Sequence, residues 1–321
     1  MLPGGRTRIA GFDSLRLLAM AIITVQHGLS VIGHYDRTQI TAGCTLGQFG
    51  VAIFCGLAGW FAIGGRQATG AWLAARLVRL FPAYWAATLL AFALAVGLGR
   101  PVTAGLFVSQ MLGLGYFSHG MALVNVVSWF ISLILLCYAL AALARLSSRP
   151  RLCMVVFSAG ALALVLSGAE TVLARHVLAF TAAAAVAASG RPHLALVAGS
   201  GITLAALLAP GLLVAGVALI AIGLFQAPVL PSWQAVTAAS ACTYEYFLLH
   251  GLFLQAGVTL AGPSATGLVL GLIASVPAVL LLKRFADAVA AKAREASPIR
   301  ISDSRTGRTP VRRGRSTETG P

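Results

Sequence analysis

The chain has 321 residues, of which 59% are hydrophobic and only 10% are charged, and its mean hydropathy is +0.90. This composition excludes an ordinary soluble domain, and the continuous apolar runs exclude a membrane β-barrel, whose strands alternate apolar and polar residues. The net charge of +15 does not indicate nucleic-acid binding, because ten of the 23 basic residues lie between Lys283 and Arg315. A basic stretch beside a membrane helix favours a role in topology or contact with anionic lipid.

Ten apolar runs are candidate membrane spans, so the sequence predicts an all-α, polytopic membrane helical bundle. The run 102–117 is also apolar, but glycines and a glutamine interrupt it, which favours a re-entrant or interfacial segment. We expect a transmembrane domain at residues 1–290 and a disordered basic tail at 291–321. The ten candidate spans cover residues 10–32, 45–64, 80–98, 124–145, 152–168, 172–189, 194–209, 211–228, 240–261 and 265–282.

The placement of arginine predicts the orientation of this bundle. If the N-terminus is cytoplasmic, the arginine-rich segments 66–79, 145–151 and 291–321 all fall on the cytoplasmic side, as the positive-inside rule requires. An even number of spans then places both termini in the cytoplasm. The sequence therefore predicts a multi-pass protein of the cell (plasma) membrane, and it shows no internal repeat of the transporter type.

The first span carries three ionisable residues, Asp13, Arg16 and His27. Such groups are costly in hydrocarbon, so they usually face a cavity or a pathway and mark function. At about 100° per residue, Arg16 and His27 differ by only ~20° around the helix axis, and Asp13 lies within roughly 60° of both. The three residues form a polar stripe that rises about 16 Å from Arg16 to His27. Two interpretations of Asp13 stay open, a functional role or simple neutralisation of Arg16.

Two arginines, Arg76 and Arg79, lie at the predicted cytoplasmic end of the third span. Their spacing places them on one helix face, and forked guanidinium groups suit phosphate binding. The alternative is a positive-inside anchor followed by an interfacial aromatic belt, here Tyr84 and Trp85. On these residues alone the anchor is the favoured interpretation.

The later spans add weaker candidates. Trp129 begins an aromatic helix edge, and the ninth span holds Tyr244, Glu245 and His250. Glu245 and His250 are five residues apart and do not share a helix face; they could line the cavity that His27 faces, or make a structural contact between helices. No metal site is predicted, because the five cysteines have no ligand-like spacing. The remaining histidines, His34, His119, His176 and His193, are interpreted as ordinary polar positions.

Taken together, these segments resemble the acyltransferase-3 family of membrane O-acyltransferases. The matching motifs occur in the family's order across residues 10–282. The chain departs from the family where Ala58-Gly59-Trp60 replaces Ser-Gly-Phe, where Ile134 replaces a glutamate, and in lacking a soluble hydrolase-like extension after Leu282. The motifs are Asp13-x-x-Arg16-x10-His27, Gly50-Val51-x-x-Phe54, Arg76-x-x-Arg79-x-x-Pro82-x-Tyr84-Trp85, Trp129 with Tyr138, and Tyr244-Glu245-x-x-Leu248-x-His250.

The resemblance implies transfer of an acyl group, commonly acetyl, from a cytoplasmic acyl-CoA to a hydroxyl of a carbohydrate, cell-envelope glycan or secondary metabolite. It implies a donor substrate, acetyl-CoA, rather than a bound cofactor, and membrane lipid as the surroundings. The oligomeric state stays open. By the same resemblance, the catalytic group is His27 with Arg16 and Asp13, the donor-binding residues are Arg76, Arg79, Tyr84 and Trp85, and the substrate cavity is lined by Trp129, Tyr244, Glu245 and His250.

The physical chemistry of the stripe fits this role. Imidazole titrates near neutral pH, so His27 could take a proton from an acceptor hydroxyl as general base. The thioester oxygen then becomes anionic, and Arg16 is a conceivable source of positive field. No serine or cysteine lies in a recognisable nucleophile motif, which favours direct transfer. Two other functions stay open: a transporter or flippase for a polar or lipid-linked solute, and a scaffold whose basic tail recruits a partner.

Overall fold

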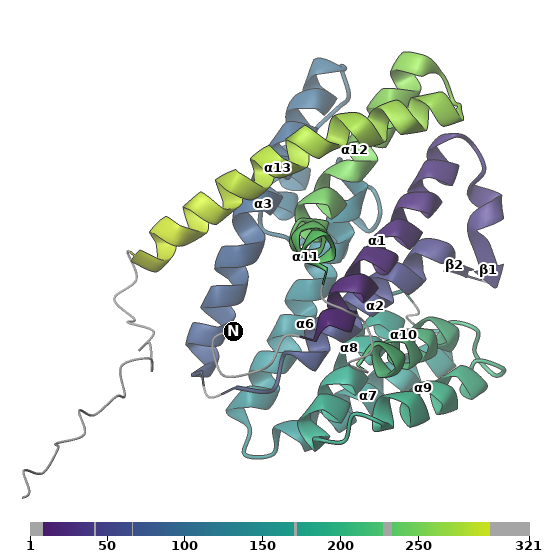
Figure 1. Cartoon of the computed structure of the whole chain (residues 1–321), viewed down its shortest axis with the longest axis vertical. Coiled ribbons are helices and arrows are strands. Elements are labelled where there is room, and N and C mark those ends of the chain that lie inside the picture. Colours follow the sequence, from purple (N-terminus) through teal and green to yellow (C-terminus); the bar gives the residue numbers. More distant parts are fainter. Residues whose placement is uncertain (1–8, 42, 66, 170–171, 227–232, 296–321) are drawn as a thin grey trace, which may run out of the picture.

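The computed structural model describes residues 9–41, 43–65, 67–169, 172–226 and 233–295 (Figure 1). Nearly all of this part of the chain is helical, and each predicted span overlaps one helix. The all-α fold class is therefore confirmed. The ten helices are α1 (Ala10–Val31), α2 (Leu46–Trp60), α3 (Thr69–Gly97), α6 (Trp129–Leu146), α7 (Pro150–Ser167), α8 (Val172–Ser189), α9 (Leu194–Ala205), α10 (Leu212–Phe225), α12 (Thr243–Ala261) and α13 (Ala265–Glu295).

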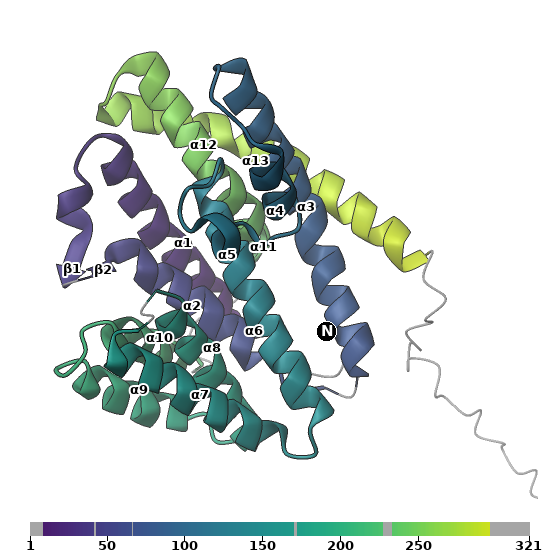
Figure 2. The same ribbon diagram turned by 180° about the vertical axis from the view of Figure 1, so that it is seen from behind.

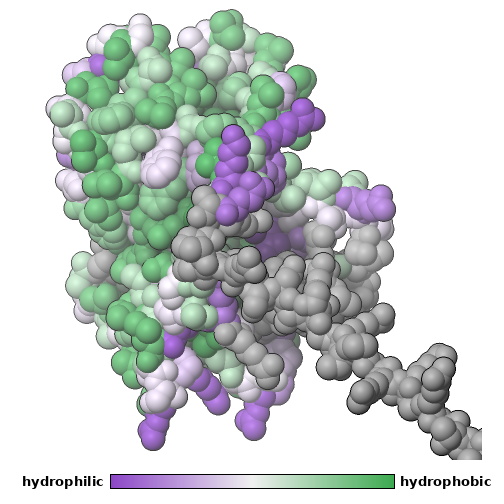
Figure 3. Space-filling model, turned by 90° about the vertical axis from the view of Figure 1, so that its left-hand side faces the viewer, coloured by the Kyte–Doolittle hydropathy of each residue, from purple (hydrophilic) through white to green (hydrophobic). Residues whose placement is uncertain are grey.

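Within the described residues, six helical segments are long and apolar enough to cross a membrane. They correspond to α1, α3, α6, α7, α8 and α13, while α2, α9 and α10 are shorter apolar helices. A multi-span membrane bundle is thus confirmed, and the number of ten crossings stays a prediction. The face shown in Figure 3 is largely hydrophobic, with hydrophilic side chains gathered at its lower end and in a second group at mid-height.

The segment 102–117 does not form a span. It folds into two short helices, α4 (Ala104–Met111) and α5 (Gly115–His119), each far shorter than the ~20 residues that cross a bilayer. Gly113 separates them with φ +75°, a conformation that glycine adopts without strain. Seen from behind, α4 and α5 lie beside α3 and α6 (Figure 2). The break predicted from the glycines of this run is confirmed.

The remaining elements are short. The segment between α1 and α2 holds a 3-10 turn and an antiparallel strand pair, and another 3-10 turn precedes α6. A two-turn helix precedes α12. These elements are η1 (Tyr35–Thr38), β1 (Gln39–Thr41), β2 (Cys44–Thr45), η2 (Val126–Ser128) and α11 (Gln234–Ala241).

Helix α1 connects two groups of helices. On one side it packs against α2, which in turn packs against α8 and α10; on the other it packs against α11 and α12, and α12 packs against α13 (Figure 1). Glycines of α2 allow the close approach. A Cβ at Gly50 would lie 2.5 Å from the carbonyl oxygen of Ala19, and one at Gly59 would lie 2.0 Å from that of Phe180. Small residues at helix contacts permit such close packing.

Helix α13 extends beyond its predicted span. It runs to Glu295, so residues 291–295, which were expected to begin the disordered tail, are helical. An i, i+4 pair in this extension joins Lys283 Nζ to Asp287 Oδ1 at 2.6 Å, a spacing that supports helical structure. The rest of the predicted tail, 296–321, lies outside the described residues.

Candidate active site

The lower part of the α1 stripe is an ion pair with one further donor. Arg16 Nη1 lies 2.9 Å from Asp13 Oδ1, and the hydroxyl of Ser240 at the end of α11 donates to the same oxygen at 2.9 Å. Asp13 is buried, whereas the Arg16 side chain is 33% exposed. This geometry supports the interpretation that Asp13 neutralises Arg16, whose side chain stays partly exposed.

The upper part of the stripe is a pair of imidazoles. The rings of His27 and His250 meet edge to face, with centroids 4.9 Å apart and planes at 83°. His250 is fully buried and His27 is partly exposed. The structure therefore brings together the two histidines that the sequence placed in the first and ninth spans.

The surroundings of His250 fix its ring. Its Nδ1 lies 2.7 Å from the carbonyl oxygen of Phe247, and its other face stacks on Tyr246 with centroids 5.7 Å apart. The Thr24 hydroxyl is 3.4 Å from that of Tyr246. Because a carbonyl oxygen only accepts, Nδ1 carries the hydrogen and Nε2 is the acceptor atom of the neutral ring.

The two parts of the stripe lie about three helical turns apart. Eleven residues of helix separate Arg16 from His27, which is about 16 Å along the axis. A thioester carbonyl placed next to His27 would lie three turns from the guanidinium, which is itself held by Asp13. The role of Arg16 as a source of positive field for the oxyanion stays a prediction, as does a role in holding the donor.

The two arginines of α3 have different surroundings. The Arg76 guanidinium lies over the rings of Trp72 and Tyr138, 5.6 and 5.8 Å from their centroids, and Nη2 is 3.4 Å from the Phe61 carbonyl oxygen. Arg79 is exposed, and in the described part of the chain its side chain makes no hydrogen bond that would hold it. Arg76 thus joins α3 to α6, while Arg79 remains accessible to a ligand.

Both aromatic residues that were expected to bind the donor contact α4, and their role in donor binding stays a prediction. The Tyr84 hydroxyl donates to the carbonyl oxygen of Gln110, and Trp85 Nε1 donates to that of Met111 at 2.8 Å. Tyr84 is fully buried, so its hydroxyl faces protein rather than a ligand. These two side chains lie at the contact between α3 and α4.

Three of the four predicted cavity residues also contact protein groups. The Tyr244 hydroxyl donates to the Leu80 carbonyl oxygen at 2.9 Å, and the Trp129 ring packs on His176 with centroids 5.5 Å apart. Glu245 is buried, and its nearest charges include Lys283 and Arg79. Of the predicted cavity residues, only His250 contacts His27.

Sequence reasoning missed a buried polar cluster at the start of α8. His176 is fully buried, with Nδ1 2.5 Å from the Val172 carbonyl oxygen and Nε2 3.3 Å from that of Gln48. Arg175 is 2% exposed and donates to the Gly43 carbonyl oxygen at 2.7 Å. The interpretation of His176 as an ordinary polar position is wrong. The Gln48 carbonyl is distant in sequence from His176, so no residue pattern reveals this contact.

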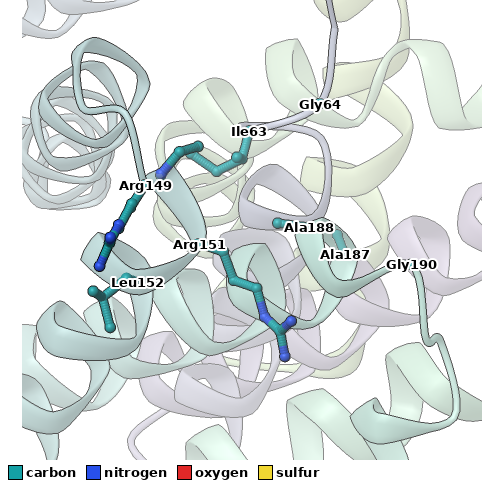
Figure 4. Close-up of a pocket in the computed structure, with 9 residues that line it drawn as sticks. Ile63, Gly64, Arg149, Arg151, Leu152, Ala187, Ala188 and Gly190 are labelled. Atoms are coloured by element: carbon teal, nitrogen blue, oxygen red, sulfur yellow. The ribbon is translucent and has the colours of Figure 1, made fainter.

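A pocket of about 590 Å³ opens where α7 begins and α8 ends (Figure 4). Arg149, Arg151 and Leu152 line it from the start of α7, Ala187 and Ala188 line it from the end of α8, and Ile63 and Gly64 line it from the segment after α2. None of the predicted site residues lines this pocket. It is therefore separate from the histidine pair.

The comparison with known families covers almost all of the described bundle. A family model described as an acyltransferase domain matches residues 9–284, which include both parts of the α1 stripe, Arg76, Arg79 and His250. No curated protein and no solved structure matches the chain. The chain belongs to the acyltransferase-3 family, and it is a multi-pass membrane acyltransferase.

Proposed function

We propose that the protein transfers an acyl group, acetyl in the first instance, from acyl-CoA to a hydroxyl of a carbohydrate, cell-envelope glycan or secondary metabolite. His27 is the general base. The observation that carries the proposal is the position of His27: a partly exposed imidazole within a membrane helix, in ring contact with a second, buried imidazole. Ionisable groups at such depth mark substrate pathways.

The reaction needs no covalent enzyme intermediate. His27 takes the proton from the acceptor hydroxyl as its oxygen attacks the thioester carbonyl, and the tetrahedral intermediate collapses with cleavage of the carbon–sulfur bond. The CoA thiolate leaves and takes the proton from His27, which regenerates the neutral imidazole. The products are the ester and CoA thiol, so protons and charge balance over one turnover.

The donor is held by cations at the opposite end of α1. Arg79 is exposed, and the Arg16 side chain is partly exposed. Arg79 and Lys283 both lie within electrostatic range of Glu245, so these two cations belong to the same region. Guanidinium groups bind phosphate oxygens well. With the phosphates of CoA at this end and the thioester at His27, the linear pantetheine arm would follow the polar face of α1. The arginine distribution supports entry of the donor from the cytoplasm.

Labelled transfer in membranes tests this function. Membrane vesicles from the producing cells supply the native acceptor, and the measured quantity is label moved from [14C]acetyl-CoA to extractable product. The wild-type chain should transfer label, and His27→Ala should reduce the rate about 10²- to 10⁴-fold. His119→Ala is the matched control, because His119 is exposed on the short helix α5.

Two outcomes would count against the proposal. Full transfer by His27→Ala would exclude His27 as the base. Flux of a polar solute in liposomes without any acyl-CoA, together with no transfer of label by the wild type, would favour the transporter alternative instead.

A further inference from the structure

His250 has one ring nitrogen that the described protein leaves without a partner. Its Nδ1 donates to the Phe247 carbonyl oxygen, whereas Nε2 is buried and makes no hydrogen bond within the described residues. The side chain is 0% exposed, so bulk water does not reach it in this state. A buried acceptor without a donor costs about 1–3 kcal/mol, and such a group calls for an explanation.

His27 is the polar ring that contacts His250 from α1. The centroid distance of 4.9 Å and the angle of 83° describe an edge-to-face contact rather than a hydrogen bond. His27 is partly exposed and carries no hydrogen bond that fixes its ring in the described structure. A rotation of its side chain about χ1 and χ2 is therefore the smallest change that can bring a His27 N–H to Nε2 of His250.

The proposed function supplies the moment at which this rotation is favourable. When His27 takes the proton of the acceptor hydroxyl, it becomes an imidazolium with two N–H donors. A hydrogen bond from a cation is about twice as strong as a neutral one, and a low-dielectric site strengthens it further. The neutral Nε2 of His250, with its hydrogen fixed on Nδ1, is a preorganised acceptor for that donor.

We infer that His250 is a positioning residue for His27: its Nε2 accepts a hydrogen bond from protonated His27 and so stabilises the imidazolium formed during transfer. This inference rests on the proposed role of His27 as base. His250 itself neither gains nor loses a proton. The proton stays on His27 until the departing CoA thiolate takes it.

Two substitutions distinguish the role of Nδ1 of His250 from that of Nε2. In His250→Asn, the short amide can keep the contact with the Phe247 carbonyl but has no atom at the position of Nε2. In His250→Gln, the longer amide can place an oxygen acceptor near that position and loses the fixed Nδ1 donor. A merely structural His250 should be replaced better by asparagine, whereas a positioning His250 should be replaced better by glutamine.

The expected result is a split between the two variants in the [14C]acetyl-CoA transfer assay. His250→Asn should lower kcat about 10- to 100-fold, the range seen when an orienting partner of a functional histidine is removed. His250→Gln should stay within about tenfold of wild type, and KM for acetyl-CoA should be unchanged in both. Thermal unfolding in detergent checks that both variants fold.

NMR of the resting protein determines the tautomer of His250 without any acceptor substrate. In protein labelled with 15N-histidine, with His250→Gln used to assign the signals, His250 should show a protonated Nδ1 and an unprotonated Nε2. A protonated Nε2 in the wild type would overturn the inference.

Equal transfer by His250→Asn and the wild type would also overturn it. An equal loss of transfer rate in His250→Asn and His250→Gln would overturn it in favour of a structural role. Absence of label transfer by the wild type would instead count against the proposed function, and the NMR result would still report the tautomer.

Discussion

Two fully buried histidines, His250 and His176, have opposite surroundings in the same bundle. Both ring nitrogens of His176 face backbone carbonyl oxygens, of Val172 and Gln48, and its face packs on Trp129. His250 has Nδ1 on the Phe247 carbonyl, its Nε2 has no partner among the described residues, and its ring contacts His27. Burial alone therefore does not distinguish the two histidines, whereas the contacts of their ring nitrogens do.

The largest expected effect is that of replacing His27, the proposed general base. His27→Gln should reduce acyl transfer about 10²- to 10⁴-fold, since general-base catalysis contributes that much. This corresponds to roughly 3–5 kcal/mol of transition-state free energy. The melting temperature in detergent should hardly change, because in the described structure His27 makes a ring contact but no hydrogen bond to the protein. Initial rates with [14C]acetyl-CoA and a thermal melt of the same sample measure both. A large fall in melting temperature with only a small fall in rate would show that His27 is a structural residue rather than the base.

His176→Phe should have the opposite signature. It preserves an aromatic ring against Trp129 but removes both contacts with the carbonyl oxygens of Val172 and Gln48. Because the neutral imidazole has one N–H, it donates to only one of these two oxygens, and loss of that donor should lower the free energy of unfolding by about 1–3 kcal/mol. The transfer rate per folded molecule should equal that of wild type. Unfolding in detergent as a function of denaturant gives the stability, and loss of rate without loss of stability would contradict the structural role of His176.

The sequence predicted the helices well because lipid makes the signal strong. A run of about 20 apolar residues has few alternatives to a membrane helix, so the ten ranges overlap ten helices. The break in 102–117 was readable from its glycines. The end of α13 at Glu295 was not, because the charged residues after 282 suit both a tail and a solvated helix that continues the span.

The candidate site was only partly predictable. Helix geometry placed Asp13, Arg16 and His27 on one face, and α1 is a regular helix over that range. The helical rise over eleven residues also predicted the separation of about 16 Å between Arg16 and His27. Partners on other helices were beyond reach: neither the donation of Tyr84 to Gln110 nor the burial of His176 leaves a pattern in the sequence.

The two arginines of α3 extend the comparison to the other end of the bundle. Arg76 resembles His176 because protein groups, the rings of Trp72 and Tyr138, hold its side chain. Arg79 resembles His250 because its side chain could still accept a ligand contact, and it is exposed. Arg79→Gln should raise the apparent KM for acetyl-CoA about tenfold, which is 1.4 kcal/mol, and leave stability unchanged. Arg76→Gln should instead lower stability by about 1 kcal/mol through lost cation–π contacts. Saturation curves and melts of both variants decide this, and equal KM increases would indicate that both arginines bind the donor.

The smallest expected effect concerns the ring that supports His250. Tyr246 stacks on His250 with planes at 19°, and its hydroxyl is 3.4 Å from that of Thr24, a long and weak contact. Tyr246→Phe keeps the stacked face and removes only the hydroxyl, so transfer should stay within about twofold and stability within about 0.5 kcal/mol of wild type. Tyr246→Ala is the informative partner, because it removes the face itself and should release the His250 ring. If Tyr246→Phe lost as much activity as Tyr246→Ala, the hydroxyl rather than the aromatic face would be the group that positions the pair of histidines.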